Sequence, residues 1–114
     1  MAKNPVTLQT CLAAADIVAL VRSGASSATA QVAAAKSRID VNEQQITAWQ
    51  HLDWQRADSQ AKLIDQKNQH GALAGVPVGV KDIIDTADQP SENGTAADRG
   101  RMPAADATAV ARLR

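Results

Sequence analysis

Apolar residues recur at helical spacing through the first part of the chain and predict a series of helices. The first run stops at Ser23 and Gly24, a pair typical of a helix end, so we expect a helix over residues 13–22. The apolar positions that define this helix are Leu12, Ile17, Leu20 and Val21. Residues 1–9 show no such pattern and are expected to form a loose lead-in.

A second helix is expected after Ser27, whose hydroxyl can accept a backbone N–H in the first turn. Ala30 supplies no carboxylate, so the reciprocal half of a capping box is missing. The buried stripe of this helix consists of Val32, Ala35 and Ile39. Because few residues join the first two helices, we expect them to form an antiparallel hairpin. The Ser26–Ser27 pair lacks glycine-rich surroundings, which favours a cap and loop over a nucleophile.

The next stretch is ambiguous, and its alternation predicts a short strand over residues 46–50. Asp53 can then cap a third helix that ends near residues 68–71. The apolar face of this helix consists of Trp54, Ala57, Ala61 and Ile64. His51 and His70 have no serine or cysteine partner close by in the sequence, so both are expected to be surface histidines.

In the next segment, residues of two types alternate at every second position. Its alternating residues are Val76, Pro77, Val78, Gly79, Val80 and Lys81. This pattern predicts a strand that ends at Lys81, with the valines on one face and mainly small residues on the other. With little side-chain bulk in such a slot, the lysine amine could lie close to a crossing backbone and act as a base. The alternative is that Lys81 is the solvated end of an edge strand, since most lysines are exposed.

The rest of the chain is predicted to be a long loop followed by a helix. Residues 85–101 are polar and contain proline and glycine, so they should run over the surface as a loop. Loops of this length in compact domains are usually functional. Pro103 breaks the chain again, and residues 106–114 begin a helix with Val110 and Leu113 on one face. This helix carries no C-terminal stop.

The segment from Gly71 to Thr86, GALAGVPVGVKDIIDT, resembles the lysine-bearing segment of the amidase signature family. The resemblance extends upstream over the expected helices and downstream over PAADATAVARLR, so it covers nearly the whole chain. It implies an enzyme that hydrolyses or transfers amide groups with a Ser–cis-Ser–Lys triad, in which Lys81 is the catalytic lysine. The serine-rich and glycine-rich loop of the family lies well beyond the lysine and falls outside these residues.

The resemblance also implies an α/β fold class. The chain is expected to be the N-terminal portion of the family's α/β/α layered fold, with helices followed by a strand that ends at the catalytic lysine. Residues 1–114 would then be an N-terminal fragment of a single amidase domain. We expect a helical lead-in over 1–70, the lysine strand and loop over 71–103, and the start of the next helix over 104–114.

The chemistry implied by the resemblance assigns different roles to two neighbouring residues. In this family the neutral lysine takes a proton from the cis-serine, which takes one from the nucleophilic serine. Arginine could not replace Lys81, because a guanidinium is not a base near neutral pH. Asp82 is expected to point away from Lys81 and to hydrogen-bond the loop backbone. In the alternative, the Asp82 carboxylate stabilises the charged form of Lys81, and a charged lysine cannot act as a base.

The composition of the chain limits the classes of partner and cofactor that we expect. Twelve basic residues balance twelve acidic ones, so no net field recruits nucleic acid or an anionic membrane. Cys11 is the single cysteine, and no His/Cys cluster indicates a metal or another cofactor. No segment has the length of a signal-peptide core or a membrane span. We therefore expect a cytoplasmic protein that binds a small amide substrate and the remainder of an amidase chain, with a homodimer left open.

Three functions compete at this point. The leading one is an amidase-type hydrolase that cleaves a carboxamide C–N bond, and the sequence of residues 82–86, DIIDT, favours a stand-alone enzyme. The alternative within the family is the A subunit of a tRNA-dependent amidotransferase. Outside it, the chain would be a non-catalytic truncated remnant that acts as a small interaction protein. Residues 1–114 alone are expected to hydrolyse no amide, because the serine pair is missing. An in-frame serine-rich and glycine-rich segment after Arg114 would support the enzyme, and a stop codon would support the remnant.

Overall fold

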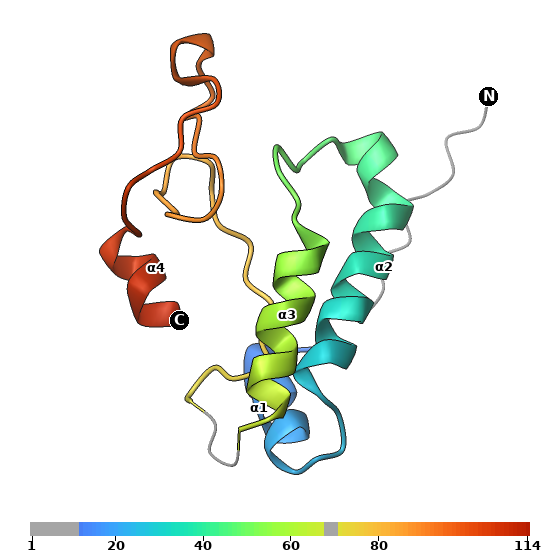
Figure 1. Cartoon of the computed structure of the whole chain (residues 1–114). Helices are drawn as coiled ribbons and strands as arrows, with labels where there is room; N and C mark the ends of the chain where they lie inside the picture. The colour runs from blue at the N-terminus through green and yellow to red at the C-terminus, as the bar shows by residue number, and fades with distance from the viewer. Residues whose placement is uncertain (1–11, 68–70) are drawn as a thin grey trace, which may run out of the picture. The chain divides into compact units, whose positions relative to one another are not determined.

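The structure, a computed structural model, describes residues 12–67 and 71–114, and all regular secondary structure in these residues is helical (Figure 1). The helices are α1 (Ala14–Arg22), α2 (Ala28–Ile46), α3 (Trp54–Asp65), the 3-10 helix η1 (Ala96–Asp98) and α4 (Thr108–Leu113). The four helices predicted from the sequence are therefore confirmed, with changes at their ends. The predictions for residues 1–9, Cys11 and His70 lie outside the described residues.

The chain divides into two compact units, which are described separately. Among the described residues, the helical unit consists of 12–49, 53–67 and 71–77, and the lysine unit consists of 50–52 and 78–114. The buried apolar residues of the helical unit are Ile17, Val18, Val21, Ala28 and Ala61. In the lysine unit the buried residues include Val110, Thr86 and Ser91. Because alanine and valine bury little area each, we expect polar contacts to contribute to holding each unit together.

The predicted α/β fold, with a strand ending at Lys81 in an α/β/α layered sheet, is wrong for the described residues. The segment begins with turns, in which the Ala74 N–H donates to Gly71 O at 3.2 Å and the Val76 N–H to Leu73 O at 3.1 Å. The residues that follow, up to the lysine, have no regular secondary structure. A strand needs a neighbouring strand to pair its main-chain groups, and no described segment supplies one.

The second predicted strand, over residues 46–50, is also wrong, because α2 continues through Ile46. Thr47 ends this helix in the left-handed conformation, with φ at 48°, and its N–H donates to Glu43 O at 2.8 Å. The Glu43 carboxylate also accepts the backbone N–H of Trp49 at 2.8 Å. The apparent alternation is therefore a helix end and the turn after it. The polar residues before Ile46 include glutamate and glutamine, which are good helix formers.

Helix α2 packs along α3 as an antiparallel pair (Figure 1). The predicted hairpin of the first two helices is therefore wrong, since the main partner of α2 is α3 and not α1. Lys36 of α2 places its Nζ 5.7 Å from the centre of the Trp54 ring of α3, within the range of a cation–π contact. The predicted buried stripe of α2 is only partly covered, since Val32, Ala35 and Ile39 are half-buried and Ala28 is the buried residue of this helix.

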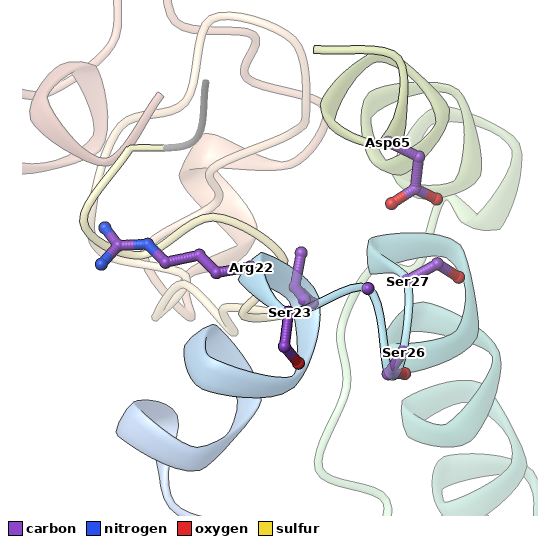
Figure 2. Close-up of a pocket in the computed structure, with 7 residues that line it drawn as sticks. Arg22, Ser23, Ser26, Ser27 and Asp65 are labelled. Atoms are coloured by element: carbon purple, nitrogen blue, oxygen red, sulfur yellow. The ribbon is translucent and has the colours of Figure 1, made fainter. Parts of the chain in front are cut away.

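The start of α2 is stabilised by the end of α3. Figure 2 shows the Asp65 carboxylate directed toward the beginning of α2. This carboxylate accepts the N–H of Ala28 at 2.6 Å and of Thr29 at 3.1 Å, and the Thr29 hydroxyl also donates to it. A negative charge at a helix N-terminus is favourable, because the first N–H groups have no partner within the helix.

Ser27 caps α2 as predicted, because its Oγ accepts the Ala30 N–H at 3.0 Å. Ser27→Ala removes this bond, and we expect the free energy of unfolding to fall by about 1 kcal/mol. Ser59→Ala is the matched control: Ser59 Oγ donates to Gln55 O at 2.8 Å within α3, where alanine is the better helix former. It should be neutral or slightly stabilising. Urea denaturation followed by circular dichroism would compare the two, and equal losses would contradict the capping role.

Candidate active site

Lys81 lies in the lysine unit, directly before a turn. Its carbonyl accepts the Ile84 N–H at 2.9 Å. The Lys81 side chain is exposed, as are Val78 and Gly79 before it, so the described residues do not form the predicted slot around the lysine. Within the described part of the chain, no carboxylate forms an ion pair with Lys81. Its amine is therefore accessible to another group.

Asp82 contacts the loop backbone, as predicted from the sequence. Its Oδ1 accepts the Glu92 N–H at 2.9 Å. The Asp82 carbonyl also accepts the Asn93 N–H at 3.0 Å. The alternative role, in which Asp82 would pair with Lys81 and hold it charged, is not what the side chain does here. Asp82 instead joins the lysine segment to the following loop.

An ion pair between Asp85 and Arg101 closes the loop after Lys81. Arg101 Nη1 and Nη2 donate to Oδ1 and Oδ2 of Asp85 at 2.6 and 2.9 Å. Arg101 Nη1 also donates to Ser91 O at 3.2 Å, and the Ser91 N–H donates to Arg101 O at 3.0 Å. The hydrogen bond from Arg101 holds the pKa of Asp85 below its ordinary value, and the same bond raises the pKa of Arg101.

Ser91 lies at the centre of this loop and is 1% exposed. Its Oγ donates to Ile84 O at 3.3 Å and accepts the Thr86 N–H at 3.4 Å. We call Asp85, Ser91 and Arg101 the loop clamp, because Arg101 is hydrogen-bonded to both of the other residues. The sequence predicted a long polar loop here but not the residues that close it. The one available indication was the opposite charge of Asp85 and Arg101 at its two ends.

The start of α4 is joined to the same loop. The Ala107 N–H donates to Asp85 O at 2.9 Å. In the other direction, the Asp106 carboxylate accepts the Ala87 N–H at 2.8 Å. Val110 of α4 is 5% exposed and is the buried apolar residue of this helix. Within the lysine unit, the loop is therefore held both by the loop clamp and by the helix that follows it.

We expect the lysine unit to lose stability in acid through Asp85. Because the pKa of Asp85 is lower in the folded chain than the about 3.9 of a free aspartate, its ion pair stabilises the fold fully above that pH. This contribution is lost as the pH falls through the lower, folded pKa. Asp85→Asn should remove this part of the acid sensitivity and weaken the loop already at neutral pH.

Amide chemical shifts of the loop, followed by NMR from about pH 6 down to about pH 2, would measure this transition. Asp58→Asn is the control, because Asp58 forms an exposed pair with Lys62 of α3 in the helical unit. It should leave the acid transition of the Ser91 amide unchanged. The same transition in Asp85→Asn as in the parent chain would contradict the role of the loop clamp.

A separate open pocket lies in the helical unit at the end of α1 (Figure 2). The residues of its lining that Figure 2 labels are Arg22, Ser23, Ser26, Ser27 and Asp65. The Ser26 hydroxyl accepts a hydrogen bond from Gln31 Nε2 at 3.0 Å, and Ser27 caps α2. The cap and loop role predicted for this serine pair is confirmed. No lysine or histidine is among the described residues that line the pocket, so it does not resemble a nucleophile with its base.

The described part of the chain offers few other groups that could form a catalytic or metal site. His51 is exposed, as predicted. Within residues 12–67 and 71–114, no group of three or more His, Cys, Asp or Glu side chains could hold a metal ion. No helix in the same residues combines the length and the apolar character required to cross a bilayer. Lys81 and the loop after it are therefore the candidate site.

A family model described as Amidase matches residues 30–114, a range that includes Lys81, Asp82 and the loop clamp. The chain belongs to the amidase family. The resemblance inferred from the sequence is thereby confirmed, and with it the general class of amidase-type C–N hydrolases. The match begins within α2, so α1 lies outside the stretch that defines the amidase family here.

Curated relatives of this amidase-family chain carry the name of the A subunit of glutamyl-tRNA(Gln) amidotransferase. Identity to the protein of that name from Salinispora arenicola is 37% over 109 residues, which covers 92% of this chain and 22% of the relative. Identity to the protein from Streptomyces avermitilis is 36% over 107 residues, which covers 90% of this chain and 21% of the relative. The chloroplastic/mitochondrial protein of Zea mays is 40% identical over 84 residues, which covers 68% of this chain and 16% of the relative. The chain thus spans about a fifth of the length of the bacterial relatives. No solved structure matches it.

Proposed function

We propose that the protein takes part in the cleavage of a carboxamide C–N bond, with Lys81 as the base that starts the reaction. The observation that supports this most strongly is the amidase-family match across the segment that carries Lys81. Lys81 also forms no ion pair with a carboxylate of the described residues, so no such pair favours the charged form of its amine. A neutral amine can accept a proton, whereas an ammonium held by a carboxylate cannot.

In the proposed mechanism, the Lys81 amine accepts a proton from the cis-serine hydroxyl, which in turn accepts the proton of the nucleophilic serine. The serine oxygen attacks the amide carbonyl carbon, and backbone N–H donors stabilise the resulting oxyanion. The Lys81 ammonium then returns its proton, through the cis-serine, to the departing nitrogen. Water releases the acyl group in hydrolysis. We assign both serines and the oxyanion donors to sequence outside residues 1–114.

A second candidate is transfer of the released nitrogen to an acceptor rather than its loss as ammonia. The names of the relatives support this candidate, because they describe the A subunit of an amidotransferase for glutamyl-tRNA(Gln). Under this proposal the protein acts with other subunits, and its final acceptor is a tRNA-bound glutamate. The DIIDT sequence after Lys81 favoured a stand-alone amidase, so the two observations point in different directions within one family.

Two assays of the full-length protein separate the candidates. A stand-alone amidase should release ammonia from a simple amide such as benzamide with no other protein present. An amidotransferase subunit should instead convert glutamyl-tRNA to glutaminyl-tRNA, and only with its partner subunits and an amide donor. A folded full-length protein that shows neither activity would contradict the proposal and favour the non-catalytic remnant.

A further inference from the structure

Asp82, the residue directly after Lys81, is held at two points by the loop that follows it. One bond runs from the Asn93 N–H to the Asp82 carbonyl at 3.0 Å, and the other from the Glu92 N–H to Asp82 Oδ1 at 2.9 Å. Both acceptors belong to the residue directly after the lysine. The two bonds together restrict the main chain and the side chain of Asp82, and the Lys81 main chain is joined to Asp82 by the preceding peptide bond.

The loop side of this contact is itself anchored. The Glu92 carboxylate accepts the Gly100 N–H at 2.7 Å through Oε1. Ser91, the residue before it, is bonded through its main chain to Arg101 in the loop clamp. The N–H groups that bind Asp82 therefore come from a fixed part of the loop. Because Lys81 is joined to Asp82 by a peptide bond, holding Asp82 also limits the movement of the Lys81 main chain.

Lys81 has no comparable anchor of its own. Its side chain is exposed, and within the described residues no hydrogen bond or ion pair to its amine is present. A lysine has a flexible four-carbon stem, so the direction of its amine depends strongly on where the main chain places the Cα. A displacement of about 1 Å in a reacting group can cost about 10²-fold in rate.

We propose that Asp82 is a positioning residue for Lys81, which uses the main chain of Glu92 and Asn93 to set the direction in which the lysine amine is presented. This role rests on the proposed function, since it requires that Lys81 acts as the base. Asp82 itself touches neither substrate nor the reacting serines. It acts by holding the lysine segment against the loop.

In the full-length protein, Asp82→Ala should lower kcat about 10²-fold while KM changes less than about threefold, because the base is displaced and the substrate site is not. Asp82→Asn keeps a side-chain oxygen as an acceptor but loses its charge, so kcat should fall by only about three- to tenfold. Asp98→Ala is the control in the same loop, because the Asp98 carboxylate accepts the Asn93 side-chain N–H at 2.9 Å. It should leave kcat within about twofold.

Amide hydrogen exchange of the full-length protein gives a readout that does not depend on activity. The Glu92 amide donates to the Asp82 carboxylate, so it should exchange at least about tenfold faster in Asp82→Ala and at the parent rate in Asp98→Ala. Unchanged exchange in Asp82→Ala would show that this bond does not form in solution and would overturn the proposal.

The kinetic outcomes separate this role from the proposed function. If Asp82→Ala keeps kcat within about twofold while Lys81→Ala is inactive, the positioning role is overturned and the proposed function stands. If Lys81→Ala is itself active, both are overturned. If Asp82→Ala does not fold, Asp82→Asn decides: a kcat equal to that of the parent overturns the role, and the expected partial loss supports it.

Discussion

Replacing Lys81 by alanine in the full-length protein is expected to lower amide turnover by about 10²- to 10⁴-fold, the range that a general base contributes. The loss can be larger where the members of a triad act as a unit. The fold should survive, because the Lys81 side chain is exposed and forms no ion pair with the described residues. Exposed substitutions of this kind usually change stability by less than about 0.5 kcal/mol.

Lys62→Ala is the matched control for this experiment. Lys62 is an exposed lysine of α3 whose Nζ lies 2.6 Å from the Asp58 carboxylate. Its removal should leave turnover within about twofold, because an exposed pair of this type contributes less than about 1 kcal/mol. Release of ammonia measures the activity, and circular dichroism measures the fold. Equal turnover of the two variants would contradict the assignment of Lys81 as the base.

The largest loss of stability is expected from Gly75→Ala. Gly75 has φ at +84°, and a Cβ at this position would lie 2.6 Å from Val21 Cγ2. Val21 is 5% exposed within the core of the helical unit, so it has little room to move away. The left-handed backbone costs about 1–2 kcal/mol for a residue with a side chain. Overpacking adds about 1–3 kcal/mol, so the free energy of unfolding should fall by about 2–5 kcal/mol.

Two other glycines separate these contributions. Gly24 has φ at +74° but nothing within 4 Å of an added Cβ, so Gly24→Ala should cost the backbone part alone, about 1–2 kcal/mol. Gly71 has neither a positive φ nor a neighbour within 4 Å, so Gly71→Ala should be close to neutral. Urea denaturation of the three variants measures the series. A Gly75→Ala chain as stable as Gly24→Ala would contradict the close packing against Val21.

The elements that the sequence predicted well are those decided by neighbouring residues. Ser23 and Gly24 end α1, and Ser27 accepts the Ala30 N–H at the start of α2. Asp53 caps α3 by accepting the Arg56 N–H at 2.9 Å. Each of these interactions spans four residues or fewer, so the sequence pattern contains both partners.

The interactions that could not be predicted join residues far apart in the chain. Asp65 accepts the N–H of Ala28, 37 residues away, and the pattern of α3 gives no indication of it. The partners Asp85 and Arg101 lie 16 positions apart at the two ends of a polar loop. Charge alone does not select one pair among twelve acidic and twelve basic residues.

The strand prediction failed for a related reason. Alternation of valines with small residues describes a segment that has two different faces, but a strand also requires a partner for its main-chain groups. The residues before Lys81 find no such partner among the described residues. The assignment of Lys81 as the base rests mainly on the family resemblance, and it stays a prediction. The contact of Asp82 with the loop backbone was predicted from its position next to Lys81 and is present.

The most direct test of Lys81 as a base is the turnover of Lys81→Arg in the full-length protein. Arginine keeps the positive charge and most of the length of the side chain, but a guanidinium is not a base near neutral pH. We therefore expect Lys81→Arg to be about as inactive as Lys81→Ala, with both folded. A variant that keeps about half of the parent turnover would show that Lys81 serves as a structural or substrate-anchoring cation, and the proposed mechanism would have to be withdrawn.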